Sequence, residues 1–185
     1  MRWTMNHRFG WAVAPLAVLA LAACQGKETA PSPSGETPAA RPSDKSVGAS
    51  VDGRLKDLVQ TSGLSSVLDG VGPYTIFAPS DAALQTLGDL GKDDATRAQG
   101  VALLRAHIVP GYMTRADISA AAQRAGADGA RLVTMAGDIL TIKADGNGLV
   151  VSTADGSVAR LTREETLASN GVVQPIDGLL AKPAA

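Results

Sequence analysis

Hydrophobic residues recur at helical spacing in two parts of the chain. Residues three or four apart share one face of a helix, so this spacing predicts helices. In the first part, the pattern predicts two short helices that are interrupted near Gly63. Their apolar positions are Val51, Leu55, Leu58, Val59, Leu64, Val67 and Leu68. The second part, residues 93–109, is expected to form one longer helix with Val101, Leu104 and Ile108 on its apolar face.

Residues that start or stop helices indicate several boundaries. Pro110 is expected to end the long helix, because a proline ring fits poorly inside a helix. Thr114 is followed three residues later by Asp117, which is typical of a capping box and predicts another helix start. A short helix is expected over residues 80–88.

The last third of the chain has the pattern of β-strands. Short β-rich runs are separated by the turn-forming sequences AGD, ADGNG and ADG, so an antiparallel meander is expected. One earlier strand is predicted at Tyr74–Phe77, and a final strand pair within residues 170–180. Since helices come first and most strands later, the predicted fold class is α+β with segregated elements.

The first 23 residues have the pattern of an export signal. Two arginines precede an apolar run at 11–23 that is too short to span a bilayer comfortably. The run ends in LAAC, and small residues directly before a cysteine resemble a bacterial lipobox. The resemblance implies cleavage before Cys24 and lipidation of that cysteine; the other interpretation is an ordinary secretory signal with an incidental cysteine. Gln25 is compatible with sorting to the outer membrane of a Gram-negative cell.

Composition divides the rest of the chain into a linker and one domain. Residues 24–50 hold the cysteine, four prolines and five serines with almost no large apolar residue, so a flexible linker is expected. Residues 51–182 are expected to form a single, monomeric domain.

Charge and residue types argue against several functions. The net charge is −1, aromatic residues make up 3% of the chain, and no basic block occurs, so nucleic-acid binding is not expected. His107 is the only histidine after residue 23, and Cys24 is the only cysteine. Neither a zinc site nor a cofactor is therefore expected.

Three stretches, taken in order, resemble the blocks of the fasciclin (FAS1) domain family. They are YTIFAPSDAAL at 74–84, LLRAHIVPGYMT at 103–114 and NGVVQPIDGLL at 170–180. The resemblance implies an antiparallel β-wedge or sandwich with helices packed around it, and a role in extracellular adhesion or matrix binding. The residues that match the blocks, as structural or binding positions, are Phe77, Pro79, Ser80, Asp81, His107, Asn170, Gly171, Ile176 and Asp177.

Three positions depart from the family pattern. Leu84 stands where the family favours Phe, Ala106 where it often has Tyr, and Gln174 where it usually has His. The last two lie in regions that are implicated in receptor contacts in some animal members. That detailed role is therefore not carried over to this chain.

Ser80 is the one candidate nucleophile, and two interpretations of it are possible. As a helix N-cap it would accept a backbone hydrogen bond, with Asp81 favourably placed in the first turn. As a nucleophile it would need His107 as its base, and no Gly-x-Ser-x-Gly elbow surrounds it. The cap is favoured. His107 is expected to be a structural residue that bonds either to Asp81 or to a backbone carbonyl.

The last block is expected to be mainly structural. Asn170-Gly171 suits a tight turn with positive φ, and Ile176 is expected to be buried. Asp177 is expected to accept backbone hydrogen bonds in a turn. Pro175 lacks a donor, so its strand is expected to lie at a sheet edge or to bulge.

These features together predict a lipid-anchored, extracytoplasmic binding module rather than an enzyme. Its partners would be the membrane, through Cys24, and a protein or polysaccharide of the envelope, matrix or cell surface. The alternatives are an envelope hydrolase that uses Ser80 and His107, and a binder of small ligands.

Overall fold

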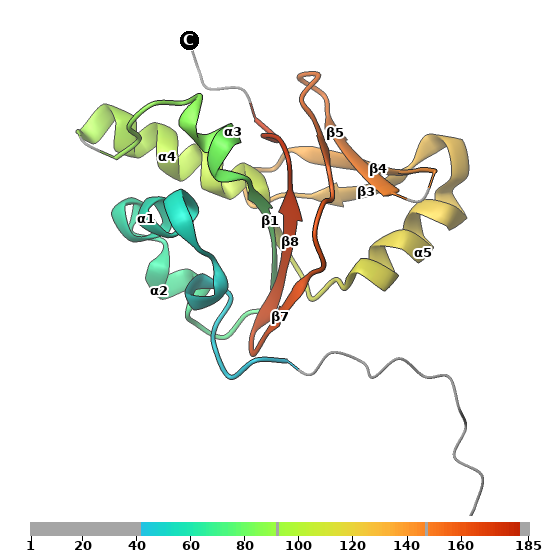
Figure 1. Ribbon diagram of the computed structural model, residues 1–185, viewed down its shortest axis with the longest axis horizontal. Helices are drawn as coiled ribbons and strands as arrows, with labels where there is room; N and C mark the ends of the chain where they lie inside the picture. Colours follow the sequence, from blue (N-terminus) through green and yellow to red (C-terminus); the bar gives the residue numbers. More distant parts are fainter. Residues whose placement is uncertain (1–41, 92, 147, 182–185) are drawn as a thin grey trace, which may run out of the picture. The chain divides into compact units, whose positions relative to one another are not determined.

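The computed structural model of the protein describes residues 42–91, 93–146 and 148–181 (Figure 1). The predicted signal, Cys24 and the linker up to residue 41 lie outside this part. The helices are α1 (Gly53–Ser62), α2 (Ser65–Leu68), α3 (Asp81–Gln85), α4 (Asp94–His107) and α5 (Arg115–Ala125), with 3-10 turns η1 (Gly48–Ser50) and η2 (Gly126–Asp128). The strands are β1 (Tyr74–Pro79), β2 (Ile108–Pro110), β3 (Ala130–Val133), β4 (Ile139–Asp145), β5 (Gly148–Thr153), β6 (Val158–Arg160), β7 (Thr166–Ala168) and β8 (Gly171–Ile176).

The strands form two four-stranded sheets, which confirms the α+β fold class. Sheet B has the order β3-β4-β5-β6 and is the predicted antiparallel meander. Sheet A has the order β2-β1-β8-β7 and is mixed, because β1 and β8 run parallel. The parallel pairing places Tyr74 opposite Gly171 and Pro79 opposite Ile176, so the first and last blocks lie side by side.

Sheet A is buried on both faces. Ile76 belongs to a hydrophobic cluster under α1, α2 and α4, whereas its neighbour Phe77 belongs to a second cluster with α5 and the inner face of sheet B. Successive side chains of a strand point to opposite faces, so these two residues anchor β1 in both clusters. Sheet A therefore separates two hydrophobic clusters and takes part in both.

The folded part begins before Val51, where the sequence analysis placed a flexible linker. The backbone N–H of Ser43 donates to Leu167 O (2.8 Å), and that of Ser169 donates to Lys45 O (2.9 Å). Val47 is fully buried. A single valine among polar residues and prolines gave too little hydrophobic pattern to reveal this docking onto β7.

Two expectations about prolines were wrong. The long helix ends at His107 rather than at Pro110, and the chain passes directly into β2, where pairing with β1 stabilises an extended backbone. Pro175 lies in β8, an inner strand and not an edge. Its carbonyl accepts from Thr162 N (2.9 Å), on the side where β7 has already ended. The nitrogen of Pro175 points to the same side, so its missing N–H removes no bond from the ladder between β7 and β8.

Candidate functional site

Ser80 forms the corner between β1 and α3, as the capping interpretation predicted. Its Oγ accepts from Ala83 N (3.3 Å) and donates to Asp177 O (3.2 Å). The second bond ties the start of α3 to the end of β8, so this serine joins the first and last blocks.

Asp81 caps a different helix from the one it belongs to. Its Oδ1 accepts from the backbone N–H of Arg54 (3.0 Å), at the start of α1. Gly53 has φ +60° there, and an added Cβ would lie 2.5 Å from both Asp81 carboxylate oxygens. The carboxylate thus satisfies a free N–H and complements the positive end of α1. A link between α1 and α3 follows, which the sequence analysis did not foresee.

His107 is buried and bonds to the backbone through both ring nitrogens. Its Nε2 accepts from Leu180 N (2.9 Å), so the ring proton is on Nδ1, which donates to Leu103 O (2.8 Å). Burial lowers the pKa of His107 to about 4. Of the two expected partners, the backbone carbonyl was right and Asp81 was wrong, because Asp81 points to α1. Neither nitrogen is left to act as a base for Ser80.

Asn170 connects three segments through its side-chain amide. Its Nδ2 donates to Leu68 O (2.8 Å) and Gly70 O (2.7 Å), and its Oδ1 accepts from Val47 N (2.7 Å). Gly171 is required for close approach rather than for positive φ, since an added Cβ would lie 2.1 Å from Tyr74 O. The expected turn geometry was therefore wrong at this glycine, because it already belongs to β8.

The remaining motif residues are structural in different ways. Phe77, Pro79 and Ile176 are buried. Asp177 is exposed, and its Oδ1 accepts from the backbone N–H of Arg160 (2.7 Å). The carboxylate therefore links the end of β8 to β6 rather than to its own turn.

Two of the positions that depart from the family pattern are also buried. The side chain of Gln174 is fully buried: its Oε1 accepts from Arg115 Nε (2.8 Å), and its Nε2 donates to Glu165 Oε2 (2.7 Å). Burial lowers the pKa of Arg115, and the neighbouring Glu165 opposes that shift. Ala106 is 2% exposed. Neither side chain is available for direct contact with a large partner.

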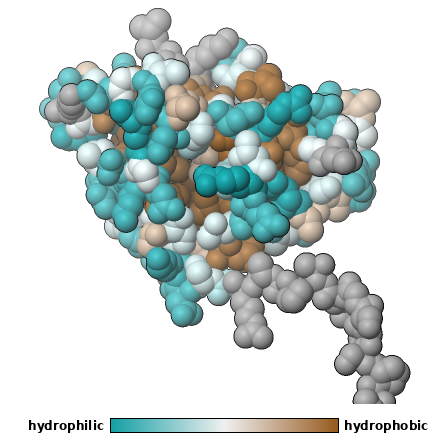
Figure 2. All heavy atoms as spheres, in the orientation of Figure 1, coloured by the Kyte–Doolittle hydropathy of each residue, from teal (hydrophilic) through white to brown (hydrophobic). Residues whose placement is uncertain are grey.

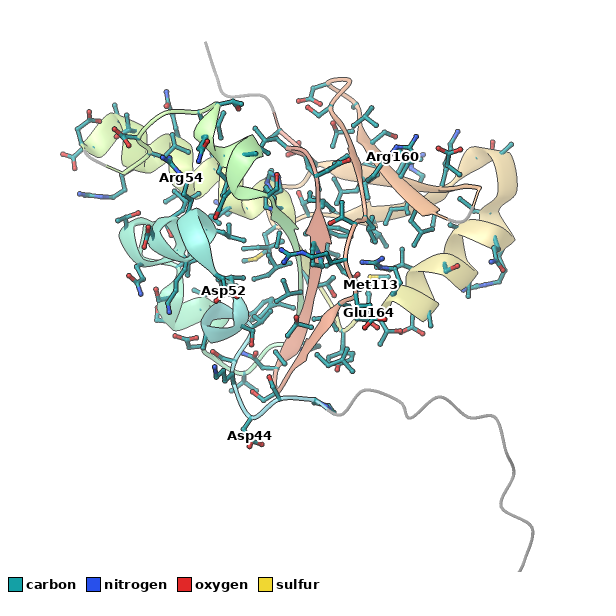
Figure 3. All side chains as sticks on the ribbon, viewed as in Figure 1. Asp44, Asp52, Arg54, Met113, Arg160 and Glu164 are labelled. Atoms are coloured by element: carbon teal, nitrogen blue, oxygen red, sulfur yellow. The ribbon has the colours of Figure 1, made fainter. Side chains whose placement is uncertain are left out.

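Five of the nine motif residues line a groove with a volume of about 360 Å³: Pro79, Ser80, Asp81, Ile176 and Asp177. It lies between the start of α1 and residues 162–166, above the ends of β1 and β8, and Ser80 lines it. In Figure 3, Asp52 and Glu164 lie on opposite sides of β8. Figure 2 shows hydrophobic residues between hydrophilic ones on this face. The charged residues that line the groove are Asp52, Asp81, Arg163, Glu164 and Asp177.

The groove presents charged, hydroxyl and apolar groups around Ser80. Its serine bonds only to backbone groups within the described chain, and no cluster of acidic or histidine side chains suited to a metal occurs among the described residues. What it offers a partner is a set of exposed carboxylates, one guanidinium and an apolar floor.

The sequence model of the fasciclin domain matches residues 53–182. The chain belongs to the fasciclin-domain family. Among its relatives, Stabilin-1 of Homo sapiens is 31% identical over 135 residues, which are 70% of this chain and 5% of that protein. Transforming growth factor-beta-induced protein ig-h3 of Sus scrofa is 33% identical over 71% of this chain and 18% of its own length. This fasciclin chain therefore spans only a small part of these two relatives.

Two further comparisons extend the range of the family. Protein sll1483 of Synechocystis is 26% identical over 68% of this chain and 64% of its own length. A FAS1 domain pair from the insect cell adhesion molecule Fasciclin I matches with a TM-score of 0.53 and 19% identity, over 69% of this chain and 44% of that one. The second likeness shows that the fasciclin fold is shared.

Proposed function

We propose that this fasciclin chain is a lipid-anchored, extracytoplasmic binding module without catalytic activity. Cys24 would carry the lipid, and a protein or polysaccharide of the envelope, matrix or cell surface would bind in the groove. The observation that carries the proposal is the groove itself, which is lined by the start of α1, the end of β1 and the segment that includes β7 and β8. Its position at the ends of two paired strands favours binding, since loops held by a scaffold lose little entropy on contact.

The sequence before the domain supports the anchoring half of the proposal. The lipobox-like LAAC ends at Cys24, and several acyl chains on one cysteine give stable attachment where one chain does not. No helix in the described ranges is both long and apolar enough to cross a membrane. The insect protein of similar fold is a cell adhesion molecule, which agrees with the proposed binding role.

Crosslinking in intact cells tests the binding half. A photoreactive amino acid at Glu164, which is exposed in the groove, is expected to capture an envelope component. The matched control is the same amino acid at Gln123, exposed on α5 and away from the groove. Identical products from both positions would contradict groove binding.

Lipid labelling and gel mobility test the anchor separately. The Cys24→Ser chain has no thiol for thioether lipidation, so it is expected to lose lipid labelling and the mobility shift that follows processing. Retention of both properties in this variant would rule out anchoring through Cys24.

A further inference from the structure

Sheet B has one covered face and one open face. Along β4, Leu140 and Ile142 are fully buried against the second cluster and α5, while Ile139 and Lys143, on either side of this pair, are exposed. On the same outer face, 58% of Val133 and 59% of Val158 are exposed. These fractions show that no described element packs on this face.

The strand register shows which outer side chains of sheet B are neighbours. Val133 lies directly opposite Ile139, which gives an aliphatic pair, and Val158 adds a third aliphatic side chain on the far edge strand. Arg131 is two residues from Val133 on β3. Arg131 pairs with Thr141 of β4, so Lys143 lies diagonally across from Arg131. Diagonal neighbours in a sheet are within reach of long side chains, so these two cations form one basic patch.

A third cation extends the basic patch along the sheet. Arg160, labelled in Figure 3, is separated from Lys143 only by Val150, which pairs with both. Its guanidinium bonds to Asp145 (2.7 Å). Neither Arg131 nor Lys143 has an ion pair among the described residues. The open face therefore has a surplus of positive charge.

This surplus stands out because the rest of the domain is acidic. Without its first 23 residues, which hold two arginines and no acid, the chain has 15 basic and 18 acidic residues. The groove near Ser80 alone has four carboxylates and one arginine. The groove and the open face of sheet B therefore carry net charge of opposite sign.

We propose that the open face of sheet B docks on an anionic membrane surface. Cations attract the phosphates of acidic lipids, and exposed aliphatic side chains enter the zone between headgroups and acyl chains. A soluble acidic polymer would use the cations alone and would leave Val133, Ile139 and Val158 in water. The combination of both kinds on one face therefore favours a bilayer.

With the proposed anchor, the open face of sheet B needs only a weak affinity for the membrane in order to dock on it. If Cys24 holds the chain on a bilayer, the linker of residues 25–41 keeps the open face at high effective concentration near the same surface. This step rests on the proposed function, but the docking face itself does not. Vesicle binding by a chain that lacks Cys24 therefore tests the face independently of the anchor.

Sedimentation with vesicles provides the test, using residues 38–185, the compact unit that contains both hydrophobic clusters. The chain is expected to bind vesicles with about 30% phosphatidylglycerol and not vesicles of phosphatidylcholine, with binding that weakens in salt. Arg131→Gln with Lys143→Gln is expected to weaken binding roughly thirtyfold. Lys56→Gln with Arg97→Gln changes the net charge equally on α1 and α4, and is expected to have little effect.

A second variant and its control test the contribution of the aliphatic side chains to vesicle binding. Val133→Ser with Val158→Ser is expected to weaken vesicle binding roughly tenfold. Val71→Ser removes a side chain that is 98% exposed elsewhere, and should leave binding unchanged. Equal losses in the charge control, or no loss in the aliphatic variant, would overturn the proposal. Binding to a soluble acidic polysaccharide but to no vesicle would overturn it as well.

Discussion

The two sheets are built from different kinds of sequence information. Sheet B consists of four consecutive strands, and its side chains alternate between buried and exposed along β4. Sheet A gathers segments from three distant parts of the chain, and five of the six residues of β8 are buried. All nine motif residues lie in sheet A or in the segments that adjoin it. The difference indicates that the family blocks mainly specify how distant segments meet.

The largest effect is expected where the two inner strands of sheet A approach most closely. Gly171→Ala would place a methyl group 2.1 Å from Tyr74 O, inside the parallel ladder. Backbone atoms there cannot shift without breaking the pairing, so we expect a loss of at least about 3 kcal/mol in unfolding free energy, measured in urea. The matched variant in sheet B, Gly148→Ala, meets its nearest atom at 3.6 Å and should stay within about 0.5 kcal/mol of the parent. Equal losses of unfolding free energy in the two variants would show that close backbone approach matters no more in sheet A than in sheet B.

The next effect depends on pH. The pKa of His107 is about 4 in the fold because burial disfavours its charged form, against 6.5 ordinarily. Above pH 6.5 both states are neutral, and the histidine contributes nothing to the pH dependence. As the pH falls from 6.5 to 4, only the unfolded state gains the proton, so we expect stability to fall by about 3 kcal/mol.

His107→Gln serves as the reference for this pH effect. It lacks the titrating group, so the difference between parent and variant isolates the histidine from the acidic residues. The difference in unfolding free energy should change by about 2 kcal/mol between pH 7 and pH 5. A constant difference would show that the ring titrates normally and that the bond to Leu180 N is not maintained.

A somewhat smaller loss is expected at the amide that joins three segments near sheet A. Asn170→Ala removes the partners of Leu68 O, Gly70 O and Val47 N, so we expect a loss of about 2–3 kcal/mol in urea unfolding. The neighbouring Ser169→Ala removes one exposed hydroxyl bond, to Lys45 O, and should cost about 0.5 kcal/mol or less. Equal losses of unfolding free energy in the two variants would show that the Asn170 amide does not join the three segments.

The smallest effect is expected at the corner between β1 and α3. Ser80→Ala removes one cap, and we expect a loss of about 1 kcal/mol in unfolding free energy with partner binding retained. Ser66→Ala on α2, which has no side-chain bond in the described chain, is the neutral comparison. Loss of a chemical turnover in the Ser80 variant, with the fold intact, would instead favour the hydrolase alternative.

The sequence predicted the local structure well. Helical spacing located α1 and α2, and Thr114 with Asp117 forms the expected capping box at α5. The turn sequences separated the strands of sheet B. These features depend on neighbours within a few residues, which a single sequence displays directly.

Contacts between distant segments were not predictable in the same way. The parallel pairing of β1 with β8 leaves no periodic trace, because both strands are buried on two faces. Asp81 looked like a first-turn residue of α3, and nothing local showed that its carboxylate reaches Arg54 N. Gly53, the first residue of α1, was the one hint in the sequence, since a glycine accommodates a close approach.

The docking of residues 43–47 determines how tension would enter the domain. A pull along the preceding chain reaches the bonds of Ser43 and Lys45 to the β7 region first, and then Val47, whose N–H is held by the Asn170 amide. The load therefore enters at the junction of β7 and β8, and the Asn170 amide shares it with Leu68 O and Gly70 O at the end of α2. A pull on the docked segment would thus be shared among β7, β8 and α2 before it reaches α1, whose first residues line the groove.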